Sequence, residues 1–204
     1  MRNIVSLTSA ALLAISLLVL PVAAEVLSSP YLVLENTGNK LFNRIASNHQ
    51  EIEKFPDVLR VIVEEELMPA IDYKYAAYRM LGKHLSKTTK EQRAQFVESI
   101  KHYLIRTYAN ALTQYKDQKV LFEKAKPTNG RSIISIKTVI IDEQRPDINL
   151  TFKMRKNKKT SQWKAFDLVV EGISLLDSKQ AELSRRIAKH GVEQVAVELA
   201  SISK

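Results

Sequence analysis

The hydrophobic pattern of this chain changes its period near residue 118. Before that point, apolar residues recur at steps of three and four, which is typical of helices that bury one face. After it, four β-branched runs alternate every second residue and are separated by short turns, as in antiparallel strands joined by hairpins. A helical pattern returns near Ser178. This order predicts an α+β fold in which N-terminal and C-terminal helices pack on one four-stranded antiparallel sheet.

Capping and helix-breaking residues set the expected boundaries of these elements. Pro30 suits a first helical position and Asp72 suits an N-cap. Gly82 suits a left-handed helix end, whereas Pro69 cannot continue a helix without losing a hydrogen bond. The expected helices span residues 30–46, 56–68, 73–81, 88–115, 178–190 and 192–202, and the expected strands span residues 120–125, 132–142, 148–155 and 162–171.

The N-terminus has the three parts of a secretory signal peptide. Arg2 is followed by an uncharged apolar run over residues 4–20, and small residues at 22–24 then precede Glu25. We expect cleavage after Ala24, which leaves a single domain over residues 25–204 outside the cytoplasm. A permanent N-terminal anchor is the alternative. The chain has no cysteine, so a lipid anchor on cysteine, a disulfide scaffold and a thiol nucleophile are all excluded.

The formal net charge of +9 needs a partner or a surface to explain it. Basic proteins bind nucleic acid, anionic membrane surfaces or acidic proteins. Export makes nucleic acid an improbable partner, so we expect none. The densest basic run is at a predicted hairpin tip and contains Arg155, Lys156, Lys158 and Lys159. These side chains either deter pairing between strand edges or form a docking patch for anionic headgroups or an acidic partner.

Both faces of the predicted sheet carry apolar residues. In the run 132–142, Ile134 and Ile136 lie on one face, while Ile133 and Ile141 lie on the other. Either helices cover both faces or the sheet curls around an apolar ligand. A cleaner line in the third strand, formed by Ile148, Leu150, Phe152 and Met154, fits either a packed core or the adaptable lining of a pocket.

No catalytic or metal-binding motif stands out. The four histidines lack the HExxH spacing of a zinc site, and Leu176 replaces the second glycine of a nucleophile elbow around Ser174. Asp167 and Glu171 would lie about 13 Å apart on one strand, which is too far for paired-carboxylate hydrolysis. We therefore expect no metal, and the sequence offers no candidate catalytic residues. An exported hydrolase without a recognisable motif, and an adaptor with a filled core, remain alternatives.

Several segments resemble the MlaC family, also called the toluene-tolerance family of periplasmic phospholipid-binding proteins. The resemblance rests on residues 80–84, on Thr89, Gln92 and Phe96, on the stretch 104–115, and above all on residues 163–167 and 170–175. The last block reads Trp-Lys-Ala-Phe-Asp and then Val-Glu-Gly-Ile-Ser-Leu. The chain departs from the family pattern at Leu85, where tryptophan is usual, and at Lys179-Gln180, where Tyr-Arg is usual.

This resemblance implies a soluble, monomeric periplasmic carrier that holds phospholipid between a curved sheet and helices. Such a carrier moves lipid between an outer-membrane lipoprotein-porin complex and the MCE-domain subunit of an inner-membrane ABC transporter, and thereby maintains outer-membrane lipid asymmetry. Its bound ligand is phospholipid, it needs no cofactor, and it is not an enzyme. The residues that we expect to line the lipid pocket are Leu104, Tyr108, Leu112, Ile134, Ile136, Ile140, Ile148, Leu150, Phe152, Met154, Phe166 and Leu168.

Overall fold

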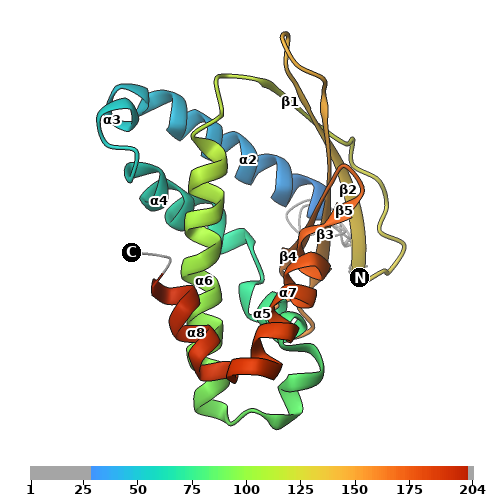
Figure 1. Cartoon of the computed structure of the whole chain (residues 1–204). Helices are drawn as coiled ribbons and strands as arrows, with labels where there is room; N and C mark the ends of the chain where they lie inside the picture. Colours follow the sequence, from blue (N-terminus) through green and yellow to red (C-terminus); the bar gives the residue numbers. More distant parts are fainter. Residues whose placement is uncertain (1–28, 202–204) are drawn as a thin grey trace, which may run out of the picture.

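The computed structural model describes residues 29–201, and the predicted signal peptide lies outside these residues. An N-terminal helical half precedes a sheet, and two helices follow it (Figure 1). The N-terminal helical elements are α2 (Pro30–Ser47), α3 (His49–Lys54), α4 (Val58–Ile62), the π-helical turn η1 (Val63–Leu67), the 3-10 turn η2 (Met68–Ala70), α5 (Tyr73–Leu81), the 3-10 turn η3 (Gly82–Lys87) and α6 (Lys90–Leu112). The helices after the sheet are α7 (Leu175–His190) and α8 (Val192–Ser201).

The sheet is an antiparallel meander in which each strand pairs with its neighbour along the chain. It contains the four predicted strands and one short addition: β1 (Lys119–Phe122), β2 (Ile133–Ile141), β3 (Ile148–Lys156), β4 (Trp163–Val170) and β5 (Ile173–Ser174). The helices gather on one face of this sheet (Figure 1). Ile134, Ile136 and Thr138 of β2 are accordingly buried, whereas Ile133, Ser135 and Lys137 are exposed. The predicted α+β class with an antiparallel sheet is confirmed.

A β-bulge in β4 changes which residues of that strand face the helices. Lys153 of β3 pairs with Asp167, but its neighbour Met154 pairs with Ala165, so Phe166 is the extra residue. Leu168 lies opposite Phe152 on one side of the bulge, and Trp163 lies opposite Lys156 on the other. Since alternation restarts at the bulge, β4 directs both Leu168 and Trp163 towards the helices.

Capping explains most of the observed helix boundaries. Asp72 accepts a hydrogen bond of 3.1 Å from the Tyr75 N–H at the start of α5. Thr89 and Gln92 form a reciprocal capping box at the start of α6. Helix α7 begins three residues before the predicted start at Ser178, because Ser174 accepts a hydrogen bond from the Asp177 N–H and serves as the N-cap.

The expected helix over residues 56–68 is not continuous. It forms α4, then widens into the π-helical turn η1, and ends in the 3-10 turn η2, which contains Pro69. Proline supplies no backbone donor and crowds the preceding turn, so regular α-helical bonds cannot run through it. Helix α3, which begins directly after Asn48, was not expected.

The buried side chains form two clusters. One joins α2, α4 and η1 to the hairpin end of the sheet and includes Ile136 and Met154, which are 0% and 1% exposed. The other joins α5, α6, α7 and α8 and includes Phe96 and Leu183. Helix α2 also approaches β1 closely, because a side chain at Gly38 would meet the Phe122 ring at 2.5 Å. The two clusters meet along α6, where a cavity remains.

Candidate ligand-binding cavity

A cavity of about 270 Å³ lies between α5, α6, α7 and the helix-facing side of β3 and β4. Apolar side chains form most of its wall, and polar groups gather in a smaller part. The apolar lining consists of Ile71, Ala76, Met80, Leu104, Tyr108, Phe152, Ala165, Phe166, Leu168, Leu175 and Leu176. The other lining residues are Tyr103, Thr107, Asp167, Ser178, Lys179 and Glu182.

Exposure divides this cavity into a closed end and a mouth. At the closed end Ile71, Ala76 and Met80 are at most 6% exposed. At the opposite end Leu175 is 43% exposed, and the side chains of Lys179 and Glu182 are 20% and 40% exposed. The cavity therefore has an apolar interior and an amphipathic opening formed by the first turns of α7.

Asp167 ties the wall formed by β4 to the start of α7. Its buried carboxylate accepts hydrogen bonds from the Ser174 hydroxyl at 2.8 Å and from the Leu176 N–H at 3.0 Å. It also forms an ion pair of 2.8 Å with Lys153. Burial alone would raise the pKa of Asp167, but these three partners together hold it below its ordinary value. The carboxylate thus stays charged and connects two walls of the cavity, β4 and the start of α7.

Tyr108 extends from α6 into the same cavity. Loss of water around its hydroxyl, with smaller contributions from Asp167 and Tyr103, raises its pKa to about 12. The phenol is therefore neutral under any physiological condition. A neutral aromatic ring beside Leu104 gives α6 a continuous apolar wall facing the sheet.

The charged groups at the mouth form a chain of ion pairs. The Lys179 ammonium lies 2.5 Å from Glu182 and 4.7 Å from the centre of the Tyr103 ring. Burial would lower the pKa of Lys179, but the bonds to Glu182 and Tyr103 more than offset this and raise it. Glu182 also accepts a hydrogen bond of 3.1 Å from Arg186, which in turn pairs with Glu198.

The structure brings together only some of the residues expected to bind lipid. Leu104, Tyr108, Phe152, Phe166 and Leu168 line the cavity. Ile134, Ile136 and Met154 instead lie in the packed core at exposures of 8%, 0% and 1%, and do not line it. Leu112, Ile140 and Leu150 are half-buried outside this lining, and Ile148 is 40% exposed.

The predicted basic patch separates into two parts. Arg155 forms an ion pair of 2.5 Å with Asp72 and lies 4.2 Å from the centre of the Tyr75 ring, so it holds the sheet to α5. Lys156 is half-buried at the end of β3. Lys158 and Lys159 are exposed in the turn between β3 and β4. These last two lysines are the part of the patch available to a partner.

Sequence reasoning missed the contribution of α7. Leu175, Leu176, Lys179 and Glu182 reach the cavity because Ser174 and Asp167 fix the start of the helix beside β4. A signal was present in the sequence, since Ser174 followed by Asp177 is a helix-start pattern. The Asp167 bond that orients this helix joins different elements and has no local signature.

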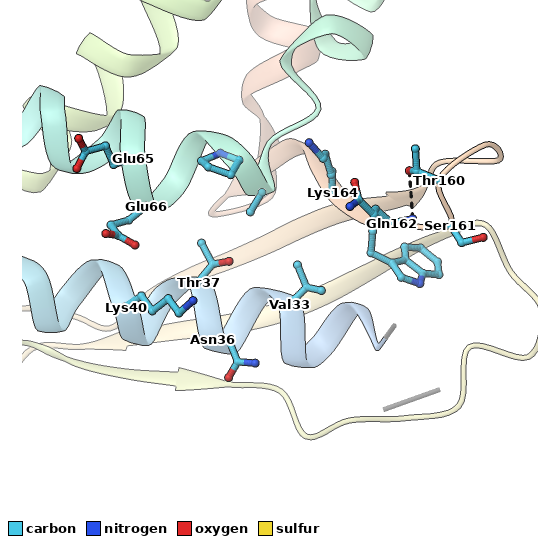
Figure 2. Close-up of a pocket in the computed structure, with 13 residues that line it drawn as sticks. Val33, Asn36, Thr37, Lys40, Glu65, Glu66, Thr160, Ser161, Gln162 and Lys164 are labelled. Carbon is cyan, nitrogen blue, oxygen red and sulfur yellow. Dashed lines mark hydrogen bonds between the residues drawn. The ribbon is translucent and has the colours of Figure 1, made fainter. Parts of the chain in front are cut away.

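A second, larger cleft has a mixed lining, with the apolar side chains of Val33, Pro69, Ala70 and Trp163 beside polar and charged ones. Figure 2 shows it between α2, the η1–η2 segment and the turn between β3 and β4. Its volume is about 750 Å³. Lys40, Lys164, Glu65 and Glu66 all line it, and the two glutamates pair with Arg44 at 2.5 and 2.7 Å. A cleft with charges of both signs suits water or a polar segment better than an acyl chain.

No arrangement with obvious catalytic chemistry is found in residues 29–201. His84 Nε2 lies 3.1 Å from Ser184 Oγ, but no carboxylate in this described range hydrogen-bonds to His84 to orient it. Ser174 is committed to capping α7 and to Asp167. The same part of the chain contains neither a group of three or more potential metal ligands nor a helix long and apolar enough to cross a membrane.

Comparisons with known proteins agree with the resemblance seen in the sequence. The sequence model of the MlaC protein family matches residues 35–201. The intermembrane phospholipid transport system binding protein MlaC of Haemophilus influenzae is 32% identical over 173 residues, which cover 84% of this chain and 81% of that protein. The toluene tolerance protein ttg2D of Pseudomonas putida is 25% identical over 158 residues, which cover 76% of this chain and 70% of that protein.

A solved structure has the same fold. The phospholipid-binding protein of Ralstonia solanacearum, solved in complex with a phospholipid, superposes with a TM-score of 0.76 at 19% sequence identity. The match covers 86% of this chain and 97% of that one.

Proposed function

The chain belongs to the MlaC family, and from this premise we propose that it is a phospholipid carrier of the periplasm. It binds lipid without chemical conversion, since MlaC proteins are lipid-binding carriers and not enzymes. In this role it shuttles phospholipid between complexes of the inner and outer membranes and so maintains the lipid asymmetry of the outer membrane. The alternatives of an adaptor with a filled core and of an exported hydrolase fit the molecule less well.

The observation that carries this proposal is the apolar cavity between α6 and the sheet. Its closed interior matches acyl chains, and its amphipathic mouth matches a headgroup that stays near water. Acyl chains require such burial, because each methylene group exposed to water costs about 0.8 kcal/mol. A filled core, as expected of a pure adaptor, would leave no such space.

Loading must widen this cavity. Its volume of about 270 Å³ is small beside the roughly 300–1,000 Å³ of typical pockets for drug-sized ligands. The half-buried side chains of Leu104, Phe152 and Leu168 are the part of the wall that an acyl chain would displace first. With Tyr108 and Phe166, they are the lipid-contacting residues in this proposal.

Transfer also needs docking partners. We assign this role to the MCE-domain subunit of an inner-membrane ABC transporter and to an outer-membrane lipoprotein-porin complex. If the cavity solvates acyl chains nearly as well as a bilayer, a few kcal/mol of partner contacts set the direction of transfer. Lys158 and Lys159 are exposed at a hairpin tip and suit an acidic docking surface or anionic headgroups.

The bound ligand provides the direct test. The mature protein, purified without detergent, should show in native mass spectrometry an added mass that organic extraction removes. Thin-layer chromatography of the extract should identify about one phospholipid per chain. Protein that carries only its sequence mass, even after incubation with phospholipid vesicles, would exclude the carrier function.

Two neighbouring positions of β4 offer a matched test of the cavity. Leu168 lines the cavity, whereas Val169 points to the opposite face of the sheet, and both are half-buried. Leu168→Glu places a charge among acyl chains and should reduce bound phospholipid by at least about tenfold. Val169→Glu should leave lipid binding close to that of the unmodified protein. Thermal unfolding of both variants checks that each is folded, and equal lipid content in the two would exclude this cavity as the site.

A further inference from the structure

Among the residues that line the cavity, Lys179 is the one cation. Lys179 lines the cavity from the first turns of α7, and its side chain is 20% exposed. The Tyr103 ring lies 4.7 Å from the ammonium, and Tyr103 and Thr107 add hydroxyl groups to the lining of the same cavity. The Ser178 hydroxyl also belongs to this lining, but it donates a hydrogen bond of 2.8 Å to the Ser174 carbonyl. A lysine at the entrance of an apolar cavity is a suitable arrangement for an anion attached to an apolar chain.

The present partner of Lys179 can release it without being left unpaired. Glu182 is shared between Lys179 at 2.5 Å and Arg186 at 3.1 Å. If an incoming anion takes Lys179, Glu182 keeps its bond to Arg186, and Arg186 keeps its bond to Glu198. This exchange avoids the cost of an isolated carboxylate at a partly buried site.

The geometry points to Lys179 as the anchor for the phosphodiester group of the bound phospholipid, with Glu182 as the competing internal anion. This inference rests on the proposed carrier function, and it identifies the side chain that holds the lipid headgroup. The acyl chains enter the apolar interior, and the phosphate stays at the mouth, where the exposed face of Lys179 meets it. Glu182 forms an ion pair with Lys179 when the cavity is empty, and this ion pair breaks when the lipid phosphate binds Lys179.

The first test compares two lipids that share acyl chains and differ in phosphate. Unmodified protein and the Lys179→Gln variant are titrated against fluorescent phosphatidylglycerol and against the corresponding diacylglycerol. Lys179→Gln should weaken phosphatidylglycerol binding about tenfold, as expected for one charge-assisted hydrogen bond near water, and leave diacylglycerol binding unchanged. Lys179→Arg should restore binding. The matched control is Lys189→Gln, which removes an exposed cation from the same helix outside the cavity.

The second test should increase the affinity for phosphatidylglycerol instead of lowering it. Glu182→Gln removes the competing anion, so it should strengthen phosphatidylglycerol binding several-fold while diacylglycerol binding stays constant. A residue that merely supported the fold would weaken both lipids in both variants. Loss of binding in Glu182→Gln, or an equal effect of Lys179→Gln on the two lipids, would contradict the assignment of Lys179 as the phosphate anchor.

A third arm separates a lipid phosphate from free phosphate. Inorganic phosphate alone should not raise the melting temperature of the unmodified protein, because one lysine contact without buried chains binds weakly. Stabilisation by inorganic phosphate that disappears in Lys179→Gln would reassign the site to free anions. If the unmodified protein binds neither lipid, the carrier function itself fails; if it binds both and Lys179→Gln changes nothing, only the anchor fails.

Discussion

The helix-facing side of the sheet is closely packed in one part and borders a cavity in another. Met154 and Trp163, towards the hairpin between β3 and β4, and Ile136 of β2, which pairs with Phe152, are at most 4% exposed and belong to the cluster built with α2 and α4; we call these three residues the packed half. Phe152, two residues before Met154, is half-buried and borders the cavity, and so does Leu168, five residues after Trp163. We call these two residues the hollow half.

The packed half and the hollow half both contain large apolar side chains of β3 and β4. What differs is the packing opposite: side chains of α2, α4 and α6 form one buried cluster with the packed half, whereas Leu104 and Tyr108 of α6 leave space beside the hollow half. Stability and ligand binding can therefore be separated along one sheet face, which the following substitutions test.

The largest expected difference is between Ile136→Ala and Phe152→Ala. Truncation of fully buried Ile136 should lower the free energy of unfolding by about 3 kcal/mol through lost contacts and a new void. Phe152→Ala should cost less, about 1–2 kcal/mol, because its ring already borders empty space. Urea unfolding measures both. Equal losses would mean that the hollow half is packed after all.

A smaller effect on the free energy of unfolding is expected for Asp167→Asn, which weakens the hydrogen bonds between β4 and the start of α7. We expect a loss of about 2 kcal/mol at neutral pH, since a buried carboxylate bonded to three groups is replaced by an amide. The folded pKa of Asp167 is lowered, so its contribution is complete above the unfolded pKa near 3.8 and is lost as pH falls through the folded value. The stability gap between the two proteins should shrink below about pH 4. A gap that is independent of pH would contradict this role.

The smallest expected effect is an increase in stability. Thr138, which is 2% exposed, has the one buried side-chain oxygen or nitrogen in residues 29–201 without a hydrogen-bond partner. Thr138→Val keeps the shape and removes the unpaired hydroxyl, so it should stabilise the protein by about 1 kcal/mol. The thermal midpoint is the measure. A destabilised variant would show that the hydroxyl has a partner in solution.

Local signals were sufficient for the order of elements and most boundaries. Asp72 and Thr89 start helices as expected, and the turn residues between β2, β3 and β4 joined the predicted neighbours. These features depend on residues close together in the chain. The interruption of residues 56–68 by a π-helical turn was harder, because its form depends on packing as well as on Pro69.

The ambiguous pattern in β4 has a structural cause that alternation alone could not reveal. Phe166, Leu168 and Trp163 are apolar at both odd and even positions. The sequence allowed helices on both faces or an enclosed ligand. The bulge at Phe166 provides a third reason: one strand changes phase and supplies apolar residues to the same side before and after it.

The predicted lipid-binding residues on β2 and β3 show the limit of face assignment. Ile136 and Phe152 are directly paired and lie on the same face, yet only Phe152 borders the cavity. Sequence periodicity finds the face of a strand, but the distance to the opposite helix depends on side chains far away in the chain. The α7 residues at the mouth depend in the same way on Asp167.

The short contact between Ile71 and β4 bears on self-association. Strand β5 covers β4 only at Val169 and Val170, so the rest of that sheet edge needs another cover. Ile71 forms a parallel bridge with Ala165, and the Asp72 N–H donates to the Ala165 carbonyl at 2.7 Å. An uncovered strand edge next to an apolar cavity would invite a second molecule to add a strand. By closing this edge within its own chain, the protein can keep an open apolar cavity while limiting its tendency to aggregate.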